Sequence, residues 1–294
     1  MKRGAKFFLL LGFACLAIGI VGGAISFKET DFSAGTTNID IEKKIAAANI
    51  DTLTIKNDFT GMTFIPSETD EIKVRLVGTV TKDRAKDCTI DAATEGPNTW
   101  RVNVCPNKHD NFNFSFNLDE LKNLIANYDD QLRTEVTLPD KMYKAITVST
   151  DSGIVNLKEV KSESLTVNAD SGDIRVDRFE GKHLNLRVES GLINVVDGQG
   201  NVNLRASSGM ITAKLHDIGD SVLLEADSGS IELQLSPPPS SASFDVSADS
   251  GKATLDVAGV SIKESHFNSV KGIIGDGSKK VRVRADSGLV TVTD

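Results

Sequence analysis

The chain has 294 residues, of which 39% are hydrophobic and 5% aromatic, and its formal net charge at pH 7 is −8. The length and hydrophobic content suffice for one large domain or two ordinary ones. The acidic balance argues against a nucleic-acid-binding protein, because contacts to phosphates need a basic face. A solvated acidic surface is the simplest interpretation of this charge.

An uncharged apolar segment lies near the N-terminus. Lys2, Arg3 and Lys6 precede the run 7–27, which as a helix would span about 31 Å, enough for a bilayer core. We therefore expect residues 1–28 to form a transmembrane anchor. Because the cations precede the run, the positive-inside rule places the N-terminus in the cytoplasm and the remaining chain outside the cell.

Two alternatives to a retained anchor stay open. The segment resembles a cleavable signal peptide, with Gly22-Gly23-Ala24 as a small-residue cleavage site. Lipidation of Cys15 is the second, although Gly12 stands where a lipobox usually has Leu. The polar residues 29–48 are expected to form a spacer between the membrane and the folded part.

Residues 49–140 predict a less regular β region that caps the main fold. Leu53–Ile55, Met62–Ile65 and Ile72–Val77 alternate between apolar and polar side chains as strands do. Residues 60–61 and 66–70 supply the turn residues between them. We expect these strands to form an atypical opening turn of the repeat that follows.

Two cysteines flank a predicted hairpin with its turn at Glu95-Gly96-Pro97-Asn98. Pairing about the centre of this turn places Cys88 opposite Cys105, and outside the cell the pair is a candidate cross-strand disulfide. The alternative is two buried thiols, since cross-strand geometry strains a disulfide.

A short helix is expected between this hairpin and the repeats. Apolar residues recur at helical spacing, and Asn117 with Glu120 resembles a capping box. The helix either packs on an open end or flank of the sheet or binds a partner. Its apolar positions are Leu118, Leu121, Leu124, Ile125, Tyr128 and Leu132.

From about residue 146 onward one phrase, Asp-Ser-Gly or a close variant, recurs seven times. Its glycines are separated by 19, 19, 18, 20, 22 and 37 residues, and a fixed period near twenty is the signature of a solenoid. The 37-residue gap predicts a degenerate copy with Lys271-Gly272 at the turn. Glycine supplies the positive φ that a corner needs. The turn glycines are Gly153, Gly172, Gly191, Gly209, Gly229, Gly251 and Gly288.

Apolar residues surround each glycine at fixed offsets. They stand seven, five and three positions before it and two and four positions after it, as in Leu184, Leu186, Val188, Ile193 and Val195. A corner at the glycine keeps both flanking strands facing one interior. Residues 141–294 therefore predict an all-β fold, a single-stranded parallel β-solenoid whose turns bury their apolar faces by stacking.

The loop at Pro237-Pro238-Pro239 lengthens one turn to 22 residues and is expected to protrude rigidly.

The sequence predicts no catalytic, metal or cofactor site. Stacked carboxylates of Asp151, Asp170, Asp227, Asp249 and Asp286 suggest a hard cation. Glu189 and Ser207 interrupt that row, however, and turn capping explains it. The repeated serines lack a Gly-x-Ser-x-Gly elbow, and the four histidines, at positions 109, 183, 216 and 266, show no zinc spacing. Aromatic platforms for sugars are few, with Phe179, Phe244 and Phe267 in the repeats.

The phrase aliphatic-x-aliphatic-x-Ala-Asp-Ser-Gly-x-Ile-x-Val resembles a candidate-adhesin family of β-strand-repeat domains of unknown function. This family includes LiaG-like, toast-rack type membrane-anchored envelope proteins of Gram-positive bacteria. The resemblance covers about residues 50–294, including the lead-in 138–143 and the late segment 274–277. It implies a single-span, outward-facing envelope protein and carries no catalytic residues.

We therefore expect a non-enzymatic, membrane-anchored β-repeat protein that acts as an adhesin-like or scaffold module of the bacterial cell envelope. Its expected partner is an envelope protein or a cell-wall polymer, without nucleic acid and without a cofactor. Two alternatives stay open: an accessory regulator of an envelope-stress signalling system, and a glycan-active β-helix enzyme.

Overall fold

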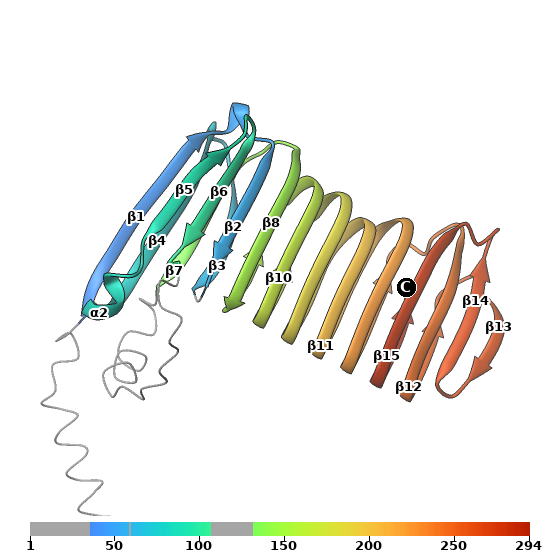
Figure 1. Ribbon diagram of the computed structural model, residues 1–294. Helices are drawn as coiled ribbons and strands as arrows, with labels where there is room; N and C mark the ends of the chain where they lie inside the picture. The colour runs from blue at the N-terminus through green and yellow to red at the C-terminus, as the bar shows by residue number, and fades with distance from the viewer. Residues whose placement is uncertain (1–35, 59, 107–131) are drawn as a thin grey trace, which may run out of the picture.

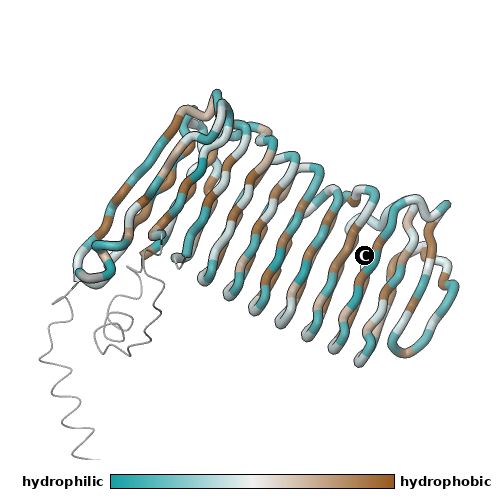
Figure 2. The backbone as a smooth tube through the Cα atoms, in the orientation of Figure 1, coloured by the Kyte–Doolittle hydropathy of each residue, from teal (hydrophilic) through white to brown (hydrophobic). Residues whose placement is uncertain are grey.

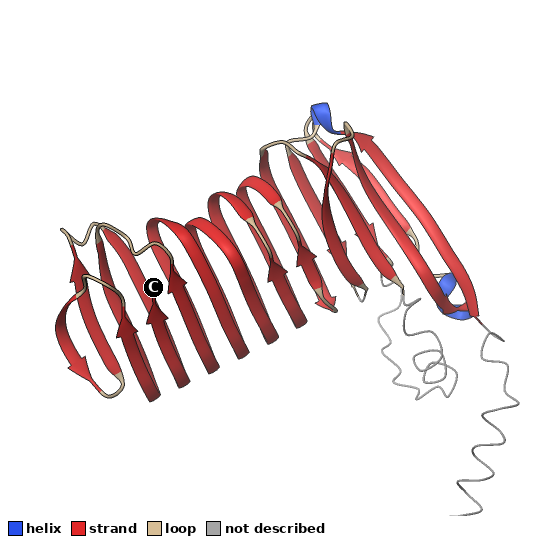
Figure 3. Cartoon of the chain, turned by 180° about the vertical axis from the view of Figure 1, so that it is seen from behind, coloured by secondary structure: helices blue, strands red, loops and turns tan. Residues whose placement is uncertain are grey.

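The chain forms one elongated coil of β-strands (Figure 1). The computed structural model describes residues 36–58, 60–106 and 132–294, and its strands form one 15-stranded sheet. Nearly all of this part of the chain is strand (Figure 3), so the predicted all-β class is confirmed. The strands in chain order are β1 (Thr36–Ala46), β2 (Thr52–Asn57), β3 (Gly61–Ser67), β4 (Glu71–Thr81), β5 (Ile90–Glu95), β6 (Thr99–Val104), β7 (Arg133–Pro139), β8 (Tyr143–Ser152), β9 (Val155–Leu157), β10 (Val160–Val176), β11 (Phe179–Leu235), β12 (Ala242–Asp256), β13 (Ser261–His266), β14 (Ser269–Ile274) and β15 (Lys279–Thr293).

In the middle of the coil each turn, here called a rung, lies parallel to the next and in register with it. β10 pairs with the first turn of β11, so that Leu165 lies opposite Leu184 and Ile174 opposite Ile193. On its other side β10 pairs with β8 and β9. β11 continues without interruption through 57 residues and three corners. The large, mostly parallel sheet has the arrangement of a β-solenoid.

The core is a stack of aliphatic side chains inside the coil. Apolar positions recur at the same place in successive turns (Figure 2). Val167, Leu186, Leu204 and Leu224 occupy one such position, five residues before the corner glycine, in four consecutive rungs, and each is buried. Burial of a side chain of this size stabilises the fold by about 1.5–3 kcal/mol. The core is long and narrow, because each rung is stabilised mainly by its two neighbours.

The strand bends at every Asp-Ser-Gly phrase while its pairing continues. Gly172, Gly191 and Gly209 have φ values of 123°, 144° and 143°, which side chains with a β-carbon rarely adopt. Val188 and Ile193 stand on either side of one such corner, an odd number of residues apart, and both are buried. The corner therefore turns both flanking strands toward one interior.

The C-terminal end does not follow chain order. β15 pairs with β11 on one side and with β12 on the other, so the last strand of the chain lies between two rungs that precede it in sequence. The degenerate copy expected at Lys271-Gly272 is wrong. Gly272 lies in β14, opposite Phe244 of β12, and the antiparallel hairpin of β13 and β14 covers the outer edge of β12. Such a hairpin closes an edge that parallel stacking alone would leave open.

The interposed strand also explains the long turn at the prolines. The loop 236–241 leaves β11 and enters β12 two rungs away, because β15 occupies the rung between them. At the start of β15, Lys279 Nζ donates to the carbonyl oxygen of Ile218 at 2.5 Å. The loop borders a cavity of about 260 Å³ that is also lined by His216 and Lys279. The predicted protruding loop is thus a bridge across one rung.

The N-terminal end is interleaved in the same way. β2 and β3 form the opening rung predicted from the sequence, which pairs with β8 and β9 on one side. On the other side it pairs with β6 and β7, a rung that comes later in the chain. The sheet therefore continues across residue 140. Antiparallel strands then close the end: β4 pairs with β7, β5 with β6, and β1 with β4.

In the described part of this end the chain forms two short helices: η1 (Ala47–Asn49), a 3-10 helix, and α2 (Lys82–Ala85). The spacer expected for residues 29–48 is in part a strand, since β1 begins at Thr36. The helix expected around residues 118–132 lies outside the described residues except for Leu132. The expected anchor 1–28 lies outside them too. Among the residues that the structure describes, no helix is long and apolar enough to cross a membrane.

Candidate interaction surface

The corner glycines stack in one column along the coil. A β-carbon on Gly209 would collide with the carbonyl oxygen of Gly191, and one on Gly229 with that of Gly209. The column continues from Gly229 to Gly288 and only then to Gly251, which confirms that the last strand is interposed. All seven glycines named from the sequence have positive φ. The corners thus pack backbone against backbone and form one straight edge of the molecule, here called the corner edge.

The residues two positions before these glycines form an acidic row along the corner edge. The strand registers extend this row to the first rung, where Asp58 stands in the position of Asp151, because Asn57 lies opposite Thr150. Sequence reasoning missed Asp58. The signal was present, since Leu53, Ile55 and Met62 surround residue 60 at the offsets seen around the glycines. In spatial order the row is Asp58, Asp151, Asp170, Glu189, Ser207, Asp227, Asp286 and Asp249.

Neighbouring basic side chains neutralise parts of the acidic row. Arg284 Nη2 lies 2.9 Å from Asp249 and 3.6 Å from Asp286. Lys56 lies 3.4 Å from the buried Asp58. In the described part of the chain Asp170 and Asp227 form no ion pair. Burial, followed by the neighbouring carboxylate of Asp58, raises the pKa of Asp151 above its usual value, while Lys56 opposes this shift.

A second row of polar groups lies on the outer face of the middle rungs. Asn168 lies opposite Arg187 in the next rung, and together with Asn185, Asn203 and Arg205 these residues line a shallow depression of about 290 Å³. Arg205 Nε donates to Asn203 Oδ1 at 3.2 Å and also lies 3.2 Å from Glu225. Amide and guanidinium groups repeated at the rung spacing suit a long polar ligand with hydroxyl or acidic groups.

One histidine belongs to a small polar cluster that the sequence did not reveal. His216 Nδ1 lies 2.5 Å from Asp197 Oδ1, and its Nε2 lies 3.0 Å from Gln199 Oε1. Arg178 donates to the other oxygen of Asp197 at 3.1 Å. Both ring nitrogens are engaged, and the contacts join successive rungs, so the cluster stabilises the stack. Among the residues that the structure describes, no three His, Cys, Asp or Glu residues gather as a metal site would require.

The two cysteines of the predicted hairpin are buried free thiols. The hairpin of β5 and β6 is confirmed, but its register is one residue away from the predicted one, because Ile90 lies opposite Val104. Cys105, at φ 46°, nevertheless brings its sulfur to Cys88. A hydrogen bond between the thiols lowers the pKa of Cys88 and raises that of Cys105, because the second ionisation would place two charges side by side. The disulfide stays a prediction.

The sequence profile of one family, Toastrack DUF4097, matches residues 50–293. This range includes every complete rung and both interleaved ends. No functionally curated protein matches the sequence.

Several solved structures resemble the coil at low sequence identity. A candidate cell adhesion protein from Clostridium sporogenes is 13% identical with a TM-score of 0.41, over 87% of this chain and 99% of that one. A candidate adhesin from Parabacteroides distasonis is 12% identical, with a TM-score of 0.35, over 87% of this chain and 96% of that one. A candidate adhesin from Bacteroides fragilis is 14% identical with a TM-score of 0.32, over the same shares of the two chains. These identities are too low to transfer what those proteins bind.

Proposed function

The chain belongs to the Toastrack DUF4097 family, and we propose that it acts without catalysis, as an adhesin-like or scaffold module of the bacterial cell envelope. The observation that carries this proposal is the register of the coil. Each outward position recurs in rung after rung at the strand spacing of about 4.8 Å, so one kind of side chain forms a long row. A row of this kind suits an extended partner bound across several turns.

The proposed location rests on the N-terminal sequence. The apolar run 7–27 with its preceding cations suits a single membrane anchor, and the coil would then lie outside the cell. In that position the outer face of the middle rungs meets either a surface protein or a wall polymer. Asn185 and Asn203, in adjacent rungs, offer donors and acceptors to the hydroxyl groups of such a polymer, and Arg187 and Arg205 offer charge to its acidic groups.

A pull-down from native membranes tests the proposal. Tagged full-length protein and a form lacking residues 1–27 are compared for what they capture. We expect both forms to capture the same wall polymer or surface protein, because the coil alone carries the binding rows. Capture of a membrane kinase or its regulator by the anchored form alone would instead favour a role in envelope-stress signalling.

Variants on the outer face locate the binding. Arg187→Ala with Arg205→Ala is expected to reduce capture, whereas Lys214→Ala, on an exposed side chain outside that face, is the matched control. Equal capture by all three proteins would place the binding elsewhere on the coil. Hydrolysis of wall glycan by the purified protein would contradict the non-enzymatic proposal.

A further inference from the structure

Exposed apolar side chains gather at one repeat position of the coil, the residue directly after the corner glycine. Ile154, Leu192, Met210 and Leu289 all stand there and are 49%, 45%, 46% and 56% exposed. These four are half of the large hydrophobic side chains that are exposed in the described part of the chain. Because the same repeat position is apolar and exposed in four rungs, these side chains form one surface, here called the apolar row.

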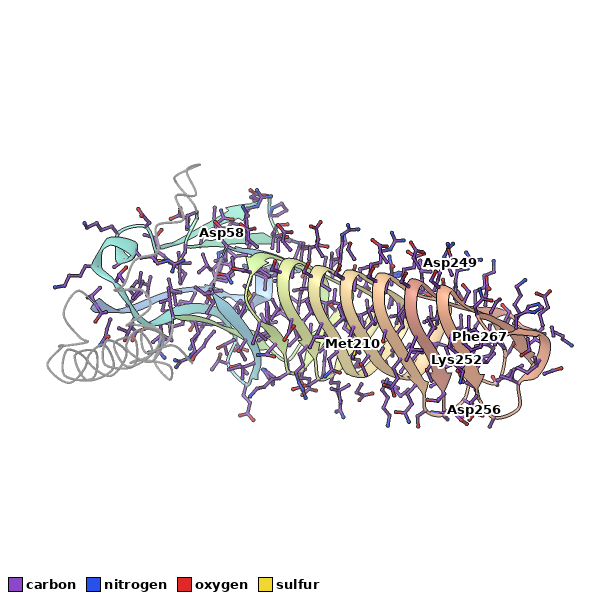
Figure 4. All side chains as sticks on the ribbon, turned by 90° about the horizontal axis from the view of Figure 1, so that it is seen from below. Asp58, Met210, Asp249, Lys252, Asp256 and Phe267 are labelled. Atoms are coloured by element: carbon purple, nitrogen blue, oxygen red, sulfur yellow. The ribbon has the colours of Figure 1, made fainter. Side chains whose placement is uncertain are left out.

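The apolar row is straight and long. Ile154 and Leu289 lie five rung steps apart, which is about 24 Å at the strand spacing. Leu192 and Met210 occupy adjacent rungs in the middle, and Asp173 and Ser230 occupy the intervening places. Figure 4 views the corner edge with Met210 in the middle of the coil and Lys252 closer to its C-terminal end.

An exposed phenylalanine extends the apolar row at its C-terminal end. Phe267, in the turn between β13 and β14, is 75% exposed. Its carbonyl oxygen accepts from the amide of Ala253 at 3.2 Å, and that of Asn268 accepts from Ala248 at 2.8 Å. These two bonds hold the turn against the last corner. Figure 4 shows Phe267 beside Lys252 accordingly.

The acidic row runs parallel to the apolar row on the other side of the corner. Asp58 and Asp249 mark its two ends in Figure 4. Members of the two rows are three residues apart in each rung, for example Asp227 and Ser230, so their backbones are at most about 10 Å apart. One α-helix, about 10–12 Å in diameter, can cover both rows at once.

We propose that the corner edge binds a cationic amphipathic helix of a partner protein, which lies along the coil axis. This inference rests on the proposed role as an interaction module and names the partner chemistry of one of its surfaces. An apolar seam of the helix packs on Leu192 and Met210, while Lys or Arg residues on its flank face Asp170 and Asp227. One helical turn advances 5.4 Å, close to the rung spacing, and 24 Å corresponds to about 16 residues.

Charge complementarity selects this partner over other occupants. Asp170 and Asp227 are exposed and form no ion pair within the described residues, so a basic flank neutralises them without displacing an existing partner. A second copy of the same chain would place two acidic rows against each other. Lys252 occupies the last place of the apolar row, so the basic flank belongs over the rungs from β9 to β15.

The test uses a synthetic 16-residue peptide of Leu, Lys and Ala with one Leu seam and a Lys flank, titrated against the full chain in uncharged detergent. Protein-free micelles give the blank. We expect saturable binding that weakens at least tenfold when Glu replaces Lys in the peptide and when salt rises from about 0.05 to about 0.5 M, since salt screens exposed charges. A peptide with its Leu residues scattered over all faces is expected to bind at least tenfold more weakly as well.

Matched variants of the protein test whether the peptide binds at the corner edge. Leu192→Ser with Met210→Ser, and separately Asp170→Asn with Asp227→Asn, are each expected to weaken binding about tenfold. The apolar control is Val196→Ser with Ile262→Ser, at side chains 41% and 47% exposed elsewhere on the coil. The charge control is Glu232→Gln with Asp256→Asn. Both controls are expected to bind within twofold of the unchanged protein.

This inference would be overturned by equal losses in the controls, by equal binding of the Glu peptide, or by absence of binding. A dimer of the unchanged protein that the Leu192→Ser, Met210→Ser variant abolishes would show that a second copy covers the apolar row. A wall polymer or surface protein captured equally by this variant would leave the interaction role intact and remove only the helix proposal.

Discussion

The rungs in the middle of the coil and the rungs at its two ends differ in the order in which the chain stacks them. In the middle, β10 and β11 stack in chain order, and each rung buries its apolar face against the next. At the C-terminal end the chain passes over one rung and later returns to fill it with β15, between β11 and β12. At the N-terminal end β2 and β3 form first, and the chain then adds β6 and β7 on one side of them and crosses over to add β8 and β9 on the other. The regular rungs make the repeated surface, and the interleaved ends close it.

The closing strands show why the ends differ. A parallel rung presents an open edge that invites pairing with other chains. At the C-terminal end the outermost strand, β13, is exposed along its whole length and antiparallel to β14. At the N-terminal end, β1 is antiparallel to β4. Each cap joins the coil through the outermost rung, β14 through β12 and β4 and β5 through β7 and β6.

The largest effect is expected at a corner in the middle. Gly209→Ala adds a β-carbon that collides with the carbonyl oxygen of Gly191 at a φ of 143°, and we expect a loss of about 4 kcal/mol in the free energy of unfolding. Gly259, in the turn before β13, has a φ of 81°, but a β-carbon added there would contact no other atom. For Gly259→Ala we therefore expect a smaller loss of about 1 kcal/mol in the free energy of unfolding. Urea unfolding of both variants measures the difference. Equal losses would show that backbone conformation, and not close stacking, sets the requirement for glycine.

An intermediate effect is expected where the chain passes over a rung. Lys141 Nζ donates to the carbonyl oxygens of Ala47 and Ile50, each at 2.6 Å. Lys141→Met leaves these oxygens without that donor, and we expect a loss of about 2 kcal/mol. Lys214→Met, in the middle of the coil, removes an exposed amine that makes no hydrogen bond within the described residues and is expected to change stability by less than about 0.5 kcal/mol. Thermal unfolding of the two variants measures the difference. Similar midpoints would show that the hydrogen bonds of Lys141, where the chain passes over a rung, contribute no more to stability than the exposed amine of Lys214.

The smallest effects are expected in the acidic row, with opposite signs at Asp151, the second residue of the row, and at Asp249, its last residue. The raised pKa of Asp151 means that the folded state binds its proton more tightly than the unfolded state does. The charged carboxyl therefore destabilises the fold above this raised pKa, and the cost disappears as the pH falls below the ordinary value of 3.8. Asp151→Asn should stabilise the protein at neutral pH by less than about 0.5 kcal/mol, because solvent screens the group, and should have no effect at pH 3.

At the other end Asp249 pairs with Arg284 at 2.9 Å. Asp249→Asn should destabilise the protein by about 0.5 kcal/mol at neutral pH, as expected for an exposed ion pair. Unfolding curves at pH 7 and pH 3 for the two variants give the comparison. Two changes of the same sign at pH 7 would contradict the difference in environment along the row.

The sequence predicted the middle of the fold well because the signal there is local. Apolar offsets around Gly172, Gly191 and Gly209 determine which side chains face inward, and a period near twenty implies stacking. The place of β15 could not be predicted from a local signal. Val283 of β15 is as apolar as Leu224 of β11 and Val246 of β12, so any two of these three strands could pack side by side. Only the pairing of distant segments distinguishes the possible orders, and the local pattern around Gly272 suggested a further copy.

The candidate surface was predictable in part. The acidic positions follow from the repeated phrase, although Asp58 was missed because Thr60 replaces the glycine of its rung. The apolar row was not recognised, since a lone exposed Leu192 or Met210 is unremarkable in sequence. Its meaning comes from the stacking, which aligns these side chains along one edge. For the cysteines, the position of the turn predicted that Cys88 and Cys105 lie together, but it gave neither the one-residue difference in register nor the positive φ of Cys105 that compensates for it.

The order of the rungs determines whether the corner edge is continuous, and disulfide trapping tests it most directly. Ser228 lies opposite Ser287, and Ser287 lies opposite Ser250, so each of these pairs is about 4.8 Å apart, within the range for a disulfide. We expect Ser228→Cys with Ser287→Cys to cross-link under mild oxidation, and Ser228→Cys with Ser250→Cys, about 9.6 Å apart, to remain reduced. Cross-linking of the second pair and not the first would contradict the interleaved end and the continuous edge that depends on it.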